Sequence, residues 1–405
     1  MKLDPRRIPS PPVAARRRTV ALLVAGAVAS VPLLAACTDN VPSASTSASA
    51  DGRSLSVRAT DTECQVSAGT APSGNLRFAV TNEGSKVTEF YVLGEDGLRI
   101  VAEVENIGPG LSRDLILKAA PGNYFTACKP GMVGDGIRHP FAVSDSGVDL
   151  APAGDDQALV EQANKNYSAY VKDQTEQLVK KTDEFAAAYK AGRDAEARTL
   201  YPVARVHWER IETVAESFGD LDPKMDLREA DLEKGQEWTG WHRIEKDLWP
   251  KRAKGYQALD PAGRKKYADD LVTNNDSLYA RVRTLTYTAD EIANGTKGLL
   301  DEVATGKVTG EEEYWSRTDL WDFQANVDGA RVGFDGLRPL LKKNDATLDR
   351  RIDEKFVALQ KLLDAHKKGE GFKLYDELSK VEVKALSDAV NALSEPLSRL
   401  TAAVV

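Results

Sequence analysis

The 405-residue chain is 42% hydrophobic and 7% aromatic, which is enough apolar side chain for ordinary globular cores. Its length has room for about two to three domains. The formal net charge is −8, and residues 1–36, which we predict to be a removed leader, hold six basic residues and one acid, so the mature chain carries −13. A surface of this sign argues against nucleic acid as a partner and favours a cation.

The first 36 residues have the features of an export signal. A basic run, RRR at 16–18, precedes the apolar stretch ALLVAGAVASVPLLAA, which is too short and too soon followed by polar residues for a membrane span. The ending LAAC at 34–37 resembles the lipobox of bacterial lipoproteins. That resemblance implies that Cys37 is lipidated and anchors the exported protein to the outer face of the cytoplasmic membrane. Residues 37–52 are small and polar, and we interpret them as a flexible tether.

Residues 53–146 have the sequence pattern of a β domain, in which short alternating or β-branched runs are separated by Gly, Pro and Asn. Runs at this spacing predict an antiparallel β-sandwich. Residues 147–156 are rich in Gly, Pro and Asp, and we expect them to be a linker. The expected strands are Leu55–Ala59, Gly74–Asn82, Thr88–Leu93, Leu98–Val104, Ser112–Leu117, Gly122–Cys128 and Pro140–Val143.

One stretch of this domain, Pro121–Ile137, resembles the last strand and loop of the cupredoxins. A blue-copper centre needs two His and a Cys with a weak axial ligand such as Met. Cys128 and Met132 are present, but KPG at 129–131 stands where the family has a histidine, and no histidine precedes His139. We therefore expect a cupredoxin-like domain without copper.

The cysteines leave two alternatives open. If Cys37 is lipidated, Cys64 and Cys128 remain as an even pair in an exported protein, for which a disulfide is the default. The alternative is a modified metal site that uses both thiolates with nearby acids such as Glu89 and Glu103.

From residue 157 to residue 405 the hydrophobic period changes from 2 to about 3.6, which is typical of helices. Long helices with short connections predict an all-α bundle domain. The expected helices are Gln157–Ala191, Asp194–Phe218, a short one at GWHRIEKDLW that ends before Pro250, Pro261–Asn294, Gly298–Thr305, Glu311–Lys342, Ala346–Lys368 and Phe372–Ala403.

The second of these helices has two distinct faces. One is an apolar stripe that we expect to face the core, with His207 in it as a hydrogen-bonded core residue. The other carries aromatic, arginine and glutamate side chains, and we expect the acidic loop and the His242 helix that follow to cover it. The apolar stripe is Leu200, Val203, His207, Ile211, Val214 and Phe218, and the polar face is Tyr201, Arg205, Trp208, Glu209, Glu212 and Glu216.

A candidate metal site is centred on His242 and Glu245. Residues three apart share one face of a helix, so this spacing brings an imidazole and a carboxylate together, although an ordinary surface pair would have the same spacing. With Glu209, Glu212 and Asp226 they would form an oxygen-rich set with one nitrogen. Such a set suits Fe, Mn or Zn and is poor for Cu(I).

The chain as a whole resembles the EfeO family, the extracytoplasmic components of the bacterial elemental iron transporter. The resemblance is carried by the order of lipobox, cupredoxin-like domain and helical domain, and by HWERIETVAESFGDLD, DLREAD, GWHRIEKDLW, GEEEYWSRTDLWDFQANVDGA and EGFKLYDEL. The helical domain of that family is imelysin-like, with a GxHxxE motif that matches Gly240, His242 and Glu245. The resemblance implies a metal site at these ligands and those named above, with Glu312 as a further one. It also implies iron, with Zn or Mn as surrogates, delivered to a membrane permease beside a haem peroxidase.

Two enzymatic roles are alternatives to this binding role. Imelysin-like proteins are grouped with peptidases, but Lys246 stands where the inverted zinc-peptidase motif requires a histidine, and the chain has only three other histidines. A ferroxidase would need a redox metal in the β domain, where the copper ligands are missing. We therefore expect a binding protein and not an enzyme.

Overall fold

The computed structural model describes residues 51–97, 100–150, 154–232 and 234–405. The predicted signal peptide at 1–36, the lipidation site Cys37 and nearly all of the predicted tether lie outside the described residues. Within the described ranges, no helix combines the length and the apolar character needed to cross a membrane.

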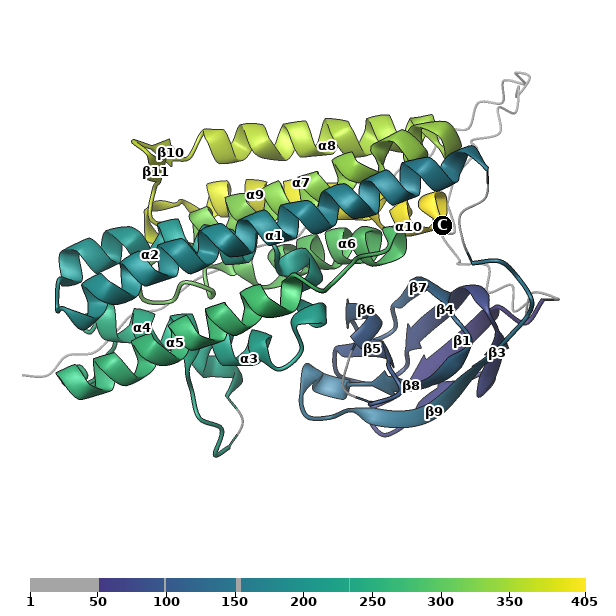
Figure 1. The fold of residues 1–405 in the computed structure, drawn as a ribbon, viewed down its shortest axis with the longest axis horizontal. Coiled ribbons are helices and arrows are strands. Elements are labelled where there is room, and N and C mark those ends of the chain that lie inside the picture. Colours follow the sequence, from purple (N-terminus) through teal and green to yellow (C-terminus); the bar gives the residue numbers. More distant parts are fainter. Residues whose placement is uncertain (1–50, 98–99, 151–153, 233) are drawn as a thin grey trace, which may run out of the picture. The chain divides into compact units, whose positions relative to one another are not determined.

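The β domain consists of a four-stranded sheet in the order β2-β1-β4-β7 and a five-stranded sheet in the order β3-β9-β8-β5-β6 (Figure 1). In β4 the side chains of Leu76, Phe78 and Val80 alternate with more exposed ones and enter a core that also takes Phe90 and Phe141 from the other sheet. The predicted sandwich is confirmed. The strands are β1 Ser54–Ala59, β2 Cys64–Val66, β3 Thr70–Pro72, β4 Gly74–Asn82, β5 Thr88–Leu93, β6 Ile100–Ile107, β7 Ser112–Ala119, β8 Gly122–Cys128 and β9 Ile137–Ser144.

The expectation of purely antiparallel pairing is wrong in two places. Strand β1 pairs in parallel with β4, and β3 pairs in parallel with β9. Parallel neighbours need a long crossover, and the segment between β1 and β4, which holds the short strands β2 and β3, supplies it. Strands of three residues are too short to show an alternating pattern, so the sequence does not reveal them.

Cys64 in β2 and Cys128 in β8 form a disulfide, with a Cα–Cα distance of 5.4 Å. Because these strands belong to different sheets, the bond ties the two layers together through the core. The expectation of a disulfide is confirmed, and the alternative thiolate metal site is wrong because the two sulfurs are bonded to each other. The acids named for that alternative have other neighbours: Glu89 accepts a hydrogen bond from Tyr91, and Glu103 is the cross-strand partner of Tyr91.

The rest of the chain is helical, as predicted. Helix α1 packs against α2, α5 and α7, while α8 packs against α7 and α9 (Figure 1). One hydrophobic core runs through these helices. Their bounds are α1 Asp155–Lys190, α2 Asp194–Glu209, α3 Leu221–Asp226, α4 Gly240–Leu248, α5 Pro261–Val282, α6 Ala289–Thr305, α7 Asp319–Asn344, α8 Ala346–Asp364, α9 Lys380–Leu397 and α10 Leu400–Val404.

Several predicted helices have the wrong boundaries. At these boundaries, helix caps and long-range contacts decide where a helix begins or ends, and the periodicity of apolar residues does not. Helix α2 ends at Glu209 and a 3-10 segment, Glu212–Phe218, follows it. The predicted helix over 261–294 is divided between α5 and α6, since Thr288 caps α6 in a reciprocal capping box with Glu291.

The C-terminal elements are also shorter than expected. Residues 311–318 are a loop, and α7 begins only at Asp319. Helix α8 ends at Asp364, and the predicted last helix is divided into α9 and α10. A two-stranded hairpin of β10 Lys367–Lys368 and β11 Gly371–Phe372 lies between α8 and α9.

Candidate metal centre

The face of α2 that carries charges is the buried one. Tyr201, Arg205, Trp208 and Glu209 are fully buried, whereas Val203 of the predicted core stripe is 41% exposed. The expectation that this stripe faces the core is therefore wrong for the first half of the segment. A charged face can be buried where its charges are paired with one another, and the pattern of apolar residues does not record such pairing.

The segments that follow α2 cover this face, as the sequence indicated. Asp226 ends α3, His242 lies in α4, and Glu312 lies in the loop before α7. Gly240 makes the approach of α4 to α3 feasible: its φ is +82°, and a Cβ atom there would lie 2.1 Å from the carbonyl oxygen of Met225. A side chain at this position would push His242 away from Asp226.

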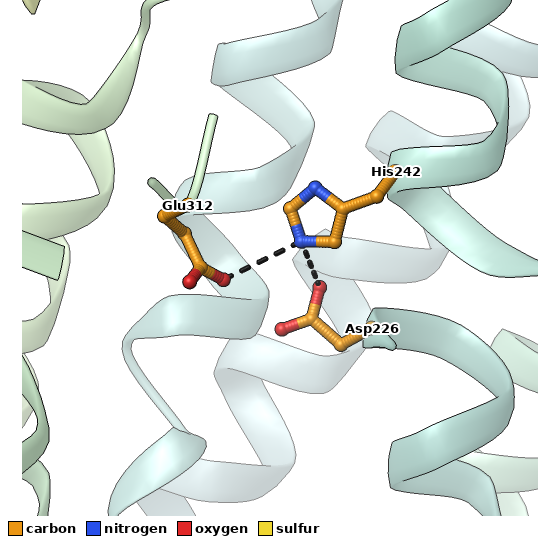
Figure 2. Close-up of side chains that lie close together, drawn as sticks. All are labelled: Asp226, His242 and Glu312. Atoms are coloured by element: carbon orange, nitrogen blue, oxygen red, sulfur yellow. Dashed lines mark ion pairs between the residues drawn. The ribbon is translucent and has the colours of Figure 1, made fainter. Parts of the chain in front are cut away.

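The imidazole of His242 is the centre of the site. Its Nε2 atom lies 3.4 Å from Oδ1 of Asp226 and 3.4 Å from Oε1 of Glu312. Figure 2 shows both contacts as dashed lines that meet at this nitrogen. On the other side of the ring, Nδ1 lies 3.4 Å from Oε2 of Glu245. His242 is 1% exposed. The ring is thus held from the Nδ1 side, while Nε2 faces two carboxylates from different segments.

Glu245 also fixes the loop that carries Glu312. Its Oε1 atom accepts hydrogen bonds from the backbone N–H groups of Trp315 at 2.8 Å and Ser316 at 2.6 Å. These bonds hold residues 311–318 in a non-helical conformation. The acceptor, Glu245, lies about 70 residues earlier in the sequence. Because a local pattern does not record such a distant contact, the sequence predicted a helix here.

Two fully or almost fully buried side-chain cations, Arg205 and Lys307, lie among the acids; the sequence placed Arg205 on the same helix face as Glu209 and Glu212, but nothing in it pointed to Lys307. The guanidinium of Arg205 contacts five carboxylates, and its Nε lies 2.7 Å from Oε1 of Glu313. Glu313 and Asp322 were not predicted: both lie in the segment expected to be the helix Glu311–Lys342, from which Glu312 alone was singled out as a ligand. The partners of Arg205 are Glu209, Asp226, Glu312, Glu313 and Asp322.

The second cation is Lys307, at the start of the 3-10 turn Lys307–Thr309. Its Nζ atom lies 2.8 Å from Oε2 of Glu209 and 2.5 Å from Oε2 of Glu212. The side-chain amide of Asn326 donates to the same two oxygens, at 2.9 and 2.8 Å. The two glutamates at the end of α2 are therefore drawn together by one ammonium and one amide.

The electrostatics divide the acids into two groups. Burial opposes the ionisation of Asp226, but Arg205 and His242 outweigh it and lower its pKa to about 2. Burial likewise opposes the ionisation of Glu312, yet Lys307 and His242 hold its pKa well below the usual range. For Glu212, Glu313 and Asp322 the nearby cations do not outweigh burial. Burial and neighbouring carboxylates therefore raise the pKa of these three acids well above the ordinary value.

The surroundings of His242 favour its protonated form. Burial and Arg205 lower its pKa, but the carboxylates of Asp226, Glu245 and Glu312 outweigh both and raise it well above the ordinary value. A metal ion needs the neutral imidazole, so an ion that binds at Nε2 must displace a proton.

The described residues contain three overlapping groups of possible metal ligands, and within each group the ligand atoms lie within 4.8 Å of one another. They are Asp226, His242 and Glu312; His242, Glu245 and Glu313; and Glu209, Glu212 and Asp226. All six residues that the sequence singled out lie in this one cluster. His207 does not: it is half-buried, its Nδ1 lies 2.9 Å from Oε1 of Gln174, and it has the hydrogen-bonded role that was expected.

The first group passes a geometric test for a metal. Nε2 of His242 is buried and has no hydrogen-bond partner among the described residues, because neither 3.4 Å contact has hydrogen-bond geometry. Two ligand atoms, each about 2.1 Å from one ion and separated by a tetrahedral angle, are about 3.4 Å apart. The spacing around Nε2 is therefore the spacing of ligands that share an ion.

Comparison with known proteins gives a family and several close relatives. The Imelysin family profile matches residues 163–400. Proteins named iron uptake system component EfeO from Yersinia pestis, Yersinia pseudotuberculosis and Escherichia coli are each 36% identical to this chain over 354 residues, which is 87% of this chain and 91% of the relative.

Proposed function

We propose an iron-binding role for this chain, which belongs to the EfeO family of iron uptake components and carries an imelysin domain at residues 163–400. In this role it captures iron outside the cytoplasm and delivers it to a membrane permease. The observation that carries the proposal is the geometry at His242, where a buried nitrogen without a hydrogen-bond partner lies 3.4 Å from two carboxylate oxygens.

The ion is held on the Nε2 side of His242 by Asp226 and Glu312. One nitrogen and several carboxylate oxygens form a ligand set that suits Fe, with Mn or Zn as surrogates. With the ion at Nε2, Glu245 would orient the imidazole through Nδ1, as carboxylates behind metal-bound histidines do. The ligand role expected for Glu245 stays a prediction, since Glu245 also forms a group of possible ligands with His242 and Glu313. Glu209 and Glu212 supply oxygens next to this position.

The balance of charge supports a multivalent cation as cargo. Among the described residues, the cations that pair with the acids of the cluster are Arg205, Lys307, Arg228 and the protonated form of His242, and the seven acids outnumber them. Burial first, and then neighbouring carboxylates, raise the pKa of Glu212 and Glu313, so the cations of the cluster do not fully offset the cost of ionising these two acids. A bound Fe²⁺ or Fe³⁺ would remove that cost. The acids are Glu209, Glu212, Asp226, Glu245, Glu312, Glu313 and Asp322.

Titration of the full chain with Fe²⁺ without oxygen, and with Zn²⁺ in air, tests the role. Isothermal calorimetry should show binding, and His242→Ala should weaken it by at least about 100-fold, since loss even of an outer-shell partner typically costs about 10- to 100-fold. The matched control is His207→Ala, which removes a half-buried histidine hydrogen-bonded to Gln174. Equal affinity in wild type and His242→Ala would refute the proposed site.

The setting of this role is the cell envelope. The disulfide between Cys64 and Cys128 is typical of proteins in oxidising compartments. A lipid anchor at Cys37 would hold the carrier at the membrane that contains the permease, which raises its effective concentration there, and the family resemblance implies a haem peroxidase as a second partner. If the anchor is correct, Cys37→Ser should move the protein from the membrane fraction to the soluble fraction. Retention on the membrane would contradict it.

A further inference from the structure

Lys307 occupies an unusual position for a lysine. Its side chain is 1% exposed, and its ammonium lies 3.9 Å from Oε1 of Glu312 in addition to its shorter contacts with Glu209 and Glu212. An ammonium loses its hydration when it is buried, and only well-placed carboxylates compensate for that loss. The lysine is therefore part of the acid cluster and not a surface residue that happens to lie near it.

The oxygens that contact Lys307 belong to the carboxylates that would bind a metal ion. Glu209, Glu212 and Asp226 each offer an oxygen within 4.8 Å of the other two, which is the spacing of a ligand group. Oε1 of Glu312 is 3.4 Å from Nε2 of His242 and 3.9 Å from Nζ of Lys307. An ion in the cluster and the ammonium of Lys307 must therefore share or compete for the same carboxylates.

The two buried cations differ in how they are held. Arg205 is a rigid planar guanidinium fixed by five carboxylates, and it is fully buried. Lys307 is a point charge on a flexible four-carbon stem. It also lines a cavity of about 1050 Å³ whose wall includes Glu212, Asp226 and Glu312. Lys307 thus borders open space toward which its flexible stem can move, whereas Arg205 is not among the described residues that line this cavity.

We infer that Lys307 is a tethered counter-ion that competes with the cargo ion for Glu209 and Glu212. Without the ion, its ammonium neutralises these two glutamates. When the ion enters, the ammonium is displaced toward the cavity, and its return helps to expel the ion. This device keeps the affinity of a buried, acid-rich site low enough for transfer to a partner. The inference rests on the proposed iron-binding function and adds a residue that sets the affinity.

The test measures metal affinity and release in the full chain. Wild type, Lys307→Met, Lys307→Gln and Lys307→Arg are titrated with Zn²⁺ and with oxygen-free Fe²⁺, and release is followed after addition of excess chelator. Both neutral variants should bind at least about tenfold more tightly and release the ion more slowly, because a positive charge that lies 2.8 Å from an oxygen of Glu209 and 2.5 Å from an oxygen of Glu212 has been removed. Lys307→Arg keeps the charge and should stay nearer to wild type than either neutral variant.

A matched control and a fold check keep the result interpretable. Lys297→Met removes another largely buried lysine, which pairs with Asp301 one turn along α6, and should leave the affinity within about twofold of wild type. Lys307→Gln retains a hydrogen-bond donor for the glutamates, so it provides the measurement if Lys307→Met does not fold. Folding is checked by circular dichroism.

The outcomes separate the two proposals. Wild-type binding together with equal or weaker affinity in the folded neutral variants would overturn the role of Lys307 and leave the iron-binding role intact. No binding by wild type would overturn both. Tighter binding and slower release in the neutral variants, with Lys297→Met unchanged, would establish Lys307 as the competing cation.

Discussion

We predict that the buried guanidinium of Arg205 is needed for the stability of the helical domain. Arg205→Met removes a fully buried guanidinium that contacts five carboxylates, among them Oε1 of Glu313 at 2.7 Å. Removing one member of a buried ionic network leaves its partners desolvated and uncompensated, which typically costs about 3 to 5 kcal/mol. Arg210, one residue beyond the end of α2, is the matched control. It pairs with Asp328 at 3.1 Å, and the two side chains are 30% and 36% exposed, so Arg210→Met should cost no more than about 1 kcal/mol.

The assay is urea unfolding of the full chain, followed by far-ultraviolet circular dichroism with chelator present. We expect Arg205→Met to lower the free energy of unfolding of the helical domain by about 2 to 5 kcal/mol more than Arg210→Met does. Added Zn²⁺ should stabilise Arg205→Met more than wild type, because the ion replaces part of the missing positive charge. Equal losses in the two variants would refute the argument that Arg205 holds the buried acids together.

Two further predictions concern residues outside the cluster. Burial, and then Arg210, lowers the pKa of His207 to about 4. The unfolded chain, with a pKa of about 6.5, then binds more protons, so stability should fall as pH drops from about 6.5 to about 4. In His207→Gln, the difference in the free energy of unfolding between pH 7 and pH 4.5 should be smaller than in wild type by about 1 to 2 kcal/mol. This is less than the full pKa shift implies, because the ring is only half-buried. An unchanged pH dependence would contradict the prediction. Replacing both Cys64 and Cys128 by Ala opens a loop with a separation of 64 residues, which the chain-entropy model equates with about 4 kcal/mol, visible in calorimetry. Metal affinity should not change, and its loss would place the ion in the β domain.

The parts of the fold that sequence predicted well are those in which one face meets an apolar core. Leu76, Phe78 and Val80 alternate along β4, and the sandwich follows from such runs. The short helix around His242 has clear ends, with Gly240 at its start and Pro250 just beyond it. In these segments the local pattern and the tertiary contacts favour the same conformation.

The candidate site is where local reasoning failed. The rule that apolar residues face inward assigned the wrong face of α2 to the core, because Arg205 and Glu209 are buried as a pair and Val203 is left 41% exposed. Pairing of charges across segments leaves no periodic trace in either segment. Lys307 is the extreme case, since its partners lie about 95 residues earlier in the chain. The sequence could therefore suggest the ligands and the helix face that carries Arg205, but not the part that Lys307 plays.

The GxHxxE stretch shows what its spacing achieves physically. Gly240, with a φ of +82° and no room for a Cβ against Met225, lets α4 begin in contact with the end of α3. Two residues later, Nε2 of His242 contacts Asp226. About one turn further along the helix, Glu245 contacts Nδ1 of the same ring. Glu245 also accepts hydrogen bonds from two backbone N–H groups of the loop that carries Glu312. Each position thus brings a different segment to one imidazole. Moving any of them by one residue would rotate its side chain by about 100° around the helix and separate the segments, so the spacing is set by the assembly of the site as much as by any single ligand.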